Sequence, residues 1–235
     1  MADDGIAVPY NLQLTPLEAV LSGVRRPGDF FVHGAHDTAM PRVEVDGVRV
    51  LSFPVPLGQV RQLIQQAVRA PYGRGRDTIV DESVRKVWQV SPDRVRVGGR
   101  SWGRTFQHIL STVTHGLGCG DTKVSAELYK LLVYDKGGFF KAHRDTEKVE
   151  GMFGTLVVVL PSAHRGGDLI LRHAGREISA NLSTTEVSEL TFAAFYADCE
   201  HEARPITSGN RVCLVYNLVQ PRTGKKRRSL TAPLY

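Results

Sequence analysis

Hydrophobic positions in the first half of the chain recur at helical spacing in two stretches. Residues 56–70 predict an amphipathic helix before Pro71, and residues 101–117 predict a second one that ends at Gly116 and Gly118. The apolar faces consist of Leu57, Val60, Leu63, Ile64, Ala67 and Val68 in the first helix and of Phe106, Ile109, Leu110 and Val113 in the second. Residues 15–23 predict a shorter helix, because Thr15 is a typical N-cap and Pro16 suits the first helical position.

Alternation of apolar and polar residues predicts strands elsewhere. Residues 42–53 alternate on both sides of Asp46-Gly47, a pattern typical of a β-hairpin. After Gly120 the predicted strands are residues 124–134, 152–160, 168–173, 189–197 and 211–219, separated by glycine-rich turns. Short strands at this spacing indicate a sandwich or a barrel. We therefore expect an α+β fold in which a helical, loop-rich first half supports an all-β second half.

Length and composition narrow the class of protein. The 235 residues are typical of one or two domains, which we place at residues 1–120 and 121–220, followed by a tail at 221–235. No apolar run approaches the roughly 20 residues that a membrane-spanning helix needs, and the first residues lack the apolar core of a secretory signal. The three cysteines are odd in number and have no CxxC spacing, which fits reduced thiols. We expect a cytoplasmic protein with no membrane partner.

The charge of the chain gives little information about partners. The net charge is +6, and four of the positive charges lie together at residues 225–228. A basic run can bind nucleic acid or an anionic membrane, but it is also typical of a solvated tail after a last strand. We interpret the run as such a tail and do not expect a nucleic-acid partner.

The residues that most clearly indicate a functional site are His143, Asp145 and His201. In an extended segment, residues two positions apart point to the same face, so His143 and Asp145 can share one cation. Taken alone, this pair is more typical of two polar residues on the protein surface. His201 follows the predicted strand at 189–197 and could supply a third ligand. Two histidines and one carboxylate leave coordination positions open, which suits Fe(II) oxygenases, whereas structural zinc usually has four ligands.

Two further polar residues could complete such a site. Arg211 lies ten residues after His201, across a turn that contains Pro205, and a hairpin centred near Ile206 would place the two residues opposite each other. A guanidinium in that position can bind a carboxylate through two hydrogen bonds. Tyr134 precedes His143 by nine residues and could donate its phenol proton to the same carboxylate. The alternatives are an ordinary strand arginine at the barrel rim and a half-buried strand tyrosine.

Taken in order, these residues resemble a known family. The series Tyr134-x-x-Gly137-x-Phe139, His143-x-Asp145, Gly166-Gly167-Asp168-Leu169, His201 and Arg211 resembles the Fe(II)/2-oxoglutarate-dependent dioxygenases, in particular their prolyl 4-hydroxylase-like branch. The resemblance implies a double-stranded β-helix, or jelly roll, that holds Fe(II) through His143, Asp145 and His201. It also implies that 2-oxoglutarate chelates the iron and that Arg211 binds its distal carboxylate, with Tyr134 as a second donor.

The implied activity is hydroxylation of a C–H bond with O2, while 2-oxoglutarate is converted to succinate and CO2. The relatives in this branch point to a peptidyl, prolyl-type substrate. Collagen-type prolyl hydroxylases usually have lysine where this chain has Arg211, which weakens that assignment of substrate. A free amino acid, another small molecule or a nucleic acid are alternatives, although the alkylation-repair enzymes usually carry asparagine where this chain has Leu132. A non-catalytic jelly-roll module that only binds metal is a further alternative.

Residues 71–88 lie where related hydroxylases carry a loop that covers the substrate. Gly73 and Gly75 could act as hinges of such a lid. Within this stretch we expect Asp81, Arg85 and Trp88 to be the residues that contact substrate. The alternative is a purely structural loop.

Overall fold

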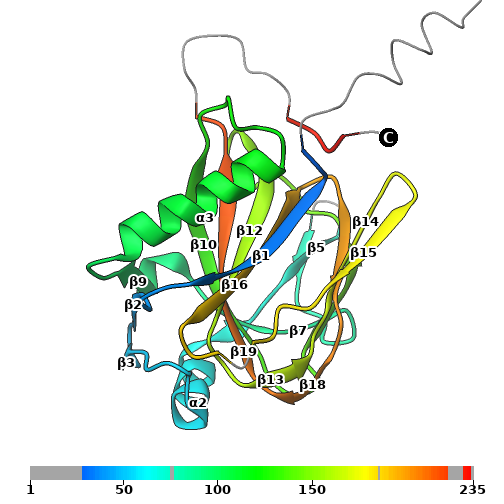
Figure 1. The fold of residues 1–235 in the computed structure, drawn as a ribbon. Helices are drawn as coiled ribbons and strands as arrows, with labels where there is room; N and C mark the ends of the chain where they lie inside the picture. Colours follow the sequence, from blue (N-terminus) through cyan, green and yellow to red (C-terminus); the bar gives the residue numbers. More distant parts are fainter. Residues whose placement is uncertain (1–27, 75–76, 185, 222–229, 234–235) are drawn as a thin grey trace, which may run out of the picture.

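Two antiparallel β-sheets face each other at the centre of the molecule (Figure 1). The computed structural model describes residues 28–74, 77–184, 186–221 and 230–233. The larger sheet has seven strands, in the order β1 (Phe31–Asp37), β16 (Glu189–Tyr196), β12 (Met152–Leu160), β19 (Arg211–Val219), β10 (Ser125–Tyr134), β8 (Trp88–Val90) and β4 (Val68–Arg69). The smaller sheet has five, in the order β15 (Arg176–Ala180), β14 (Leu169–His173), β17 (Glu200–Ala203), β11 (Phe139–His143) and β7 (Arg85–Lys86).

The chain passes back and forth between these sheets. From β10 onward it runs to β11 in the small sheet, β12 in the large, β14 in the small, β16 in the large, β17 in the small and β19 in the large. The strands β13 (His164–Gly166) and β18 (Ile206–Gly209) pair with each other at one end. This alternation is the winding of a double-stranded β-helix, and it confirms the predicted jelly-roll core. Its consequence is that side chains from consecutive strands face one another across the interior.

The central strands of the large sheet are covered on both faces. Every residue of β19 is buried, and β12 is nearly as fully buried. One face packs toward the small sheet, and the other is covered by the helix α3 (Trp102–Gly116), which crosses the sheet in Figure 1. The ring of Phe106 on α3 lies 4.7 Å from the ring of Tyr216 on β19. Strands covered on both faces are expected to be almost continuously apolar, which is the pattern of these runs.

The predicted elements of the first half are largely confirmed. The helix α2 (Leu57–Gln66) ends four residues before the predicted end at residue 70, because Val68 and Arg69 pair with β8. The predicted hairpin is present as β2 (Arg42–Val45) and β3 (Arg49–Val50), to which β9 (Val95–Gly98) adds a third strand. The remaining elements are β5 (Tyr72–Arg74), β6 (Asp77–Ile79) and the 3-10 turn η1 (Pro92–Arg94).

The expected boundary at residue 120 does not separate two packed units. Strands β1, β4 and β8 extend the large sheet, and β7 extends the small one, so segments from the first half complete both sheets. The first half was predicted to be helical and rich in loops, but it also contains the strands β1 to β9. The five strands predicted after Gly120 each agree with an observed strand to within one residue at either end. The predicted helix at 15–23 and the basic run at 225–228 lie outside the described residues, and no described helix is long and apolar enough to cross a membrane.

Candidate iron centre and active site

The small sheet brings His143 and His201 side by side. These residues are directly paired across β11 and β17, and Asp145 follows two residues after β11. His143 Nε2 lies 4.0 Å from Asp145 Oδ1, and His201 Nε2 lies 3.8 Å from Asp145 Oδ2. All three ligand atoms are within 4.8 Å of one another. The three predicted ligands therefore converge, with Asp145 placed by the segment that follows β11 rather than by the strand itself.

Backbone carbonyls fix which nitrogen of each imidazole faces the cluster. His143 Nδ1 is 2.9 Å from the carbonyl oxygen of Lys141, and His201 Nδ1 is 3.2 Å from that of Cys199. A carbonyl can only accept, so in each ring Nδ1 carries the proton and Nε2 presents its lone pair to the metal position. Contacts of this kind orient the ligands of metal sites in general.

The carboxylate of Asp145 is oriented by a hydroxyl. Thr155 on β12 donates a hydrogen bond of 2.6 Å to Asp145 Oδ2. Burial by itself would raise the pKa of Asp145, but the neighbouring His201 and the Thr155 hydrogen bond lower it below the usual value. Burial and His201 together lower the pKa of His143 to about 3. Asp145 is therefore ionised and His143 neutral, which are the forms that bind a cation.

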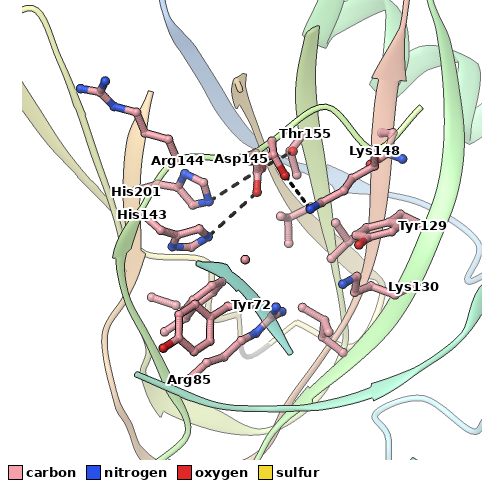
Figure 2. Close-up of a pocket in the computed structure, with 18 of the residues that line it drawn as sticks. Tyr72, Arg85, Tyr129, Lys130, His143, Arg144, Asp145, Lys148, Thr155 and His201 are labelled. Carbon is pink, nitrogen blue, oxygen red and sulfur yellow. Dashed lines mark hydrogen bonds and ion pairs between the residues drawn. The ribbon is translucent and has the colours of Figure 1, made fainter. Parts of the chain in front are cut away.

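The triad forms part of the wall of a cavity of about 380 Å³ between the two sheets. Figure 2 shows the two imidazoles and the carboxylate on one side of this space. The ring of Phe140 stacks on His143 at a centroid distance of 3.5 Å, and the ring of Phe195 lies 4.4 Å from that of His201. These rings hold the imidazoles in place from outside the cluster, while the opposite side opens into the cavity.

Arg211 is buried inside the barrel, next to the cavity-lining Tyr134. The residue is only 4% exposed and is paired with Tyr134 across β10 and β19, and its guanidinium carbon lies 4.3 Å from the ring centre of that tyrosine. It donates to the carbonyl of Gly167, and its Nε atom has no hydrogen-bond partner among the described residues. Gly167 has φ of +78°, and a Cβ there would lie 3.2 Å from Arg211 Nη1, so the glycine leaves room for the guanidinium. Tyr134 lines the cavity; Arg211 does not.

The route by which Arg211 reaches the interior differs from the prediction. Strand β17 pairs with β11 and β14, and β18 pairs with β13, so no hairpin joins His201 to Arg211. The two residues lie on opposite sheets, with Arg211 paired to Tyr134. A hairpin would require both strands in one sheet, and here the chain crosses from the small sheet to the large one between them. Arg211 still faces inward, because Val215 and Asn217, at even spacing along β19, line the cavity.

The three residues predicted to contact substrate have different locations. Arg85 on β7 lines the cavity. Asp81 accepts a hydrogen bond from the backbone of Ser83 in the turn before β7. Trp88 stacks under Arg69 and donates to Asp135. The structure does not bring Asp81 or Trp88 to the cavity wall, because they belong to the turn and the outer part of the large sheet.

Sequence reasoning missed two polar residues of the site, Thr155 and Lys130. Both interrupt strands that are otherwise apolar, Met152–Leu160 and the second half of Ser125–Tyr134. Thr155 is 5% exposed and Lys130 is 8% exposed, and both line the cavity. A polar residue in a fully buried strand needs a partner, so these interruptions were the signal that could have identified them.

The comparisons with known proteins agree with this site. Residues 129–219 match the family model described as the 2OG-Fe(II) oxygenase superfamily, and this stretch contains the triad, Tyr134 and Arg211. No curated protein sequence matches the chain. Over the matched residues the chain carries the core of the 2OG-Fe(II) oxygenase superfamily, and the cluster of His143, Asp145 and His201 lies within them.

Several solved structures are similar to the chain. A prolyl-4-hydroxylase from Pseudomonas putida is 16% identical with a TM-score of 0.49, covering 89% of this chain and 100% of that one. A prolyl hydroxylase from Trichoplax adhaerens, in complex with a peptide fragment of the hypoxia inducible factor oxygen degradation domain, is 15% identical with the same score, covering 89% and 93%. The epimerase SnoN from nogalamycin biosynthesis is 16% identical with a TM-score of 0.42, covering 94% and 96%. Likeness at this level does not identify a substrate.

The residues fit the cofactor and the cosubstrate that the superfamily uses. Two imidazoles and an ionised carboxylate, with no cysteine among the ligands, are a donor set typical of Fe(II) that must bind further ligands. Arg211 is a buried cation that has no carboxylate partner among the described residues and keeps an unused Nε atom. Burial raises the pKa of Tyr134 despite the adjacent Arg211, so its phenol keeps its proton and can donate.

Proposed function

We propose that the protein hydroxylates a C–H bond of an organic substrate held in the cavity beside the His143–Asp145–His201 triad. The reaction consumes O2 and 2-oxoglutarate and releases succinate and CO2, with one oxygen atom entering the substrate and the other entering succinate. The observation that carries this proposal is the convergence of three ligand atoms within 4.8 Å on the wall of an open cavity. A peptidyl substrate, a free amino acid and another small molecule are all compatible with such a space.

In this proposal each residue has a limited task. Bound Fe(II) with 2-oxoglutarate supplies the activation of O2 and the oxidising power, which is the chemistry of the cofactor rather than of the protein. His143 and His201 present fixed lone pairs, and Thr155 holds Asp145 in the orientation that completes the ligand set. Arg211 binds the distal carboxylate of 2-oxoglutarate, and Tyr134 donates its phenol proton to the same group. The apolar walls position the substrate and exclude water.

The first test is spectroscopic and requires no substrate. The purified protein is loaded with Fe(II) and 2-oxoglutarate without O2, and the Fe(II)–cosubstrate charge-transfer band is recorded. The band is expected in the wild type and is expected to disappear in Asp145→Ala. Labelled 2-oxoglutarate in air should then release labelled CO2. Iron binding without the band and without CO2 release would contradict the proposal and favour a module that only binds metal.

A further inference from the structure

The cavity carries more positive than negative charge. Among the described residues that line it, four are basic, namely Arg85, Lys130, Arg144 and Lys148, and only Asp145 is acidic. Arg144 and Lys148 are exposed, and the side chain of Arg144 points away from the cavity in Figure 2. Arg85 and Lys130 are different, because they are 7% and 8% exposed. Two buried cations therefore face a space that contains one carboxylate already assigned to the metal.

Arg85 is held beside the metal ligands by protein contacts that leave it without a counter-ion. Its guanidinium carbon lies 4.3 Å from the ring centre of Phe140, the ring that stacks on His143. Nη1 donates a hydrogen bond of 2.7 Å to the carbonyl of Pro71, and the buried Nε has no hydrogen-bond partner among the described residues. None of the ion pairs within the described part of the chain involves Arg85.

Lys130 approaches the cavity from the opposite sheet. It belongs to β10, whereas Arg85 belongs to β7, and Figure 2 shows their charged ends on the cavity side of the two walls. Its Nζ atom lies 3.2 Å from Gln89 Oε1 and 3.9 Å from the ring centre of Tyr129. These are neutral partners, and no described carboxylate lies within ion-pair distance of it.

The proposed cofactor and cosubstrate do not account for these cations. The two positive charges of Fe(II) are offset by Asp145 and by one carboxylate of 2-oxoglutarate, and Arg211 offsets the other carboxylate. Arg85 then remains as a buried cation without an anion, and Lys130 as a buried amine whose protonated form has no carboxylate partner among the described residues. Burying an unpaired charge costs several kcal/mol, so such groups are expected to have a partner in the working complex. The substrate is the component that can supply it.

We propose that the substrate is a carboxylate-bearing compound whose carboxylate binds between Arg85 and Lys130 while a neighbouring C–H bond faces the metal position. This inference rests on the proposed function and adds the class of substrate to it. Leu132 and Val215 form apolar wall in the same cavity and would contact the carbon skeleton. The carboxylate can belong to a free organic acid or to an acidic group of a peptide, since both present the same anion.

The experiment measures whether the protein binds a carboxylic acid more tightly than the corresponding uncharged amide. Protein loaded with Fe(II) and 2-oxoglutarate without O2 is titrated with straight-chain monocarboxylic acids of four to six carbons and with the corresponding amides. A second series uses short peptides that differ only by glutamate or glutamine. A change in the Fe(II)–cosubstrate band would report binding, because a substrate held beside the triad would change the surroundings of the bound metal. An acid is expected to bind at least tenfold more tightly than its amide in one series, and that series identifies the source of the carboxylate.

Variants then connect this preference to the two cations. Arg85→Gln and Lys130→Gln are expected to reduce the acid-to-amide ratio of affinities by about tenfold to a hundredfold, the scale of one charged hydrogen bond. Lys130→Gln keeps a polar group beside Gln89, and the ratio is insensitive to a general loosening of the cavity, which would weaken acids and amides alike. Arg96→Gln and Lys123→Gln remove equal charges from exposed positions and should leave the ratio unchanged.

The outcomes separate the two proposals. Absence of the band in the wild type would contradict the proposed function itself. A normal band with equal affinity for acids and amides, or with no binding of any acid, would overturn the inference while the proposed function stands. The inference is also overturned if Arg85→Gln raises the concentration of 2-oxoglutarate needed for the band as much as Arg211→Gln does, since Arg85 would then be a ligand of the cosubstrate.

Discussion

The metal centre and the cationic part of the cavity wall lie side by side, but they differ in whether the protein itself supplies partners for their polar groups. At the metal centre each imidazole has a backbone carbonyl behind it, and Asp145 has Thr155. On the cationic wall, Arg85 and Lys130 are buried, but their hydrogen-bond partners are neutral. The first region is pre-organised for a cation and completed by the protein. The second region lacks an anion to pair with its cations, and under our proposal the substrate supplies that anion.

The strongest way to test the first region is to remove a ligand. His143→Ala or Asp145→Ala should abolish stoichiometric iron binding and turnover, because two remaining ligands cannot hold Fe(II) against solvent. The fold should persist, since the core is apolar and lies largely outside the triad. Iron content per chain and circular dichroism measure the two effects separately. Full iron-dependent activity in either variant would show that the ligand assignment is wrong.

Removing the deep guanidinium should have the next largest effect. Arg211→Ala is expected to raise the apparent requirement for 2-oxoglutarate by about 30- to 150-fold, which corresponds to the roughly 2–3 kcal/mol of one charge-assisted contact. Iron affinity measured without 2-oxoglutarate should change far less. Arg211→Lys keeps the charge and should recover part of the loss. An unchanged requirement in Arg211→Ala would remove this residue from the cosubstrate site.

Thr155→Val tests whether the orientation of Asp145 matters. The substitution preserves the shape of the side chain but removes the hydroxyl that donates to Asp145 Oδ2. Iron affinity should fall by about tenfold to a hundredfold, as is usual when a contact behind a metal ligand is lost. Thr191→Val is the matched control. Thr191 is a buried threonine of the same sheet as Thr155, but it donates to the backbone carbonyl of Leu182 instead of to a metal ligand. Equal losses of iron affinity in both variants would mean that Thr155 acts only through general stability.

The second region predicts a gain of stability on mutation. Lys130→Met should increase the free energy of unfolding of the metal-free protein by about 1–3 kcal/mol, because it removes a buried cation that has no counter-ion. Urea denaturation at pH 7 measures the change. A loss of stability would show that Lys130 has a structural role, which would also weaken its assignment to the substrate. The same substitution should abolish the preference for acids described above.

The pH dependence of stability gives the most specific signal of the second region. Burial, together with smaller contributions from Arg85 and Lys148 and against the opposing effect of Asp145, lowers the pKa of Lys130 to about 7. Below pH 7 both folded and unfolded chains are protonated there, so the folded state bears the full cost of the buried charge. Between pH 7 and the ordinary lysine pKa only the unfolded chain keeps the proton, so the free energy of unfolding should rise with pH. The rise should be smaller in Lys130→Met, and identical slopes would contradict this origin.

Much of the fold could be predicted from local pattern. The two helices and the five long strands were correctly placed because apolar residues at regular spacing define a buried face whatever it packs against. The triad could also be predicted: His143 and Asp145 are two positions apart, and His201 follows the strand predicted at 189–197, although Asp145 lies just beyond the end of β11. The end of α2 could not, because Val68 and Arg69 leave the helical pattern only through pairing with a strand twenty residues away.

The sequence by itself therefore determined the elements, the ligand set and the chemistry that the ligand set favours. Only the tertiary structure decided that His201 and Arg211 lie on opposite sheets, because pairing of β17 with β11 and β14 depends on strands distant in the chain. It also decided that Lys130 and Arg85 meet across one cavity while Asp81 and Trp88 stay outside. Spacing along a strand specifies which face a side chain takes, but which faces meet depends on the winding of the whole barrel.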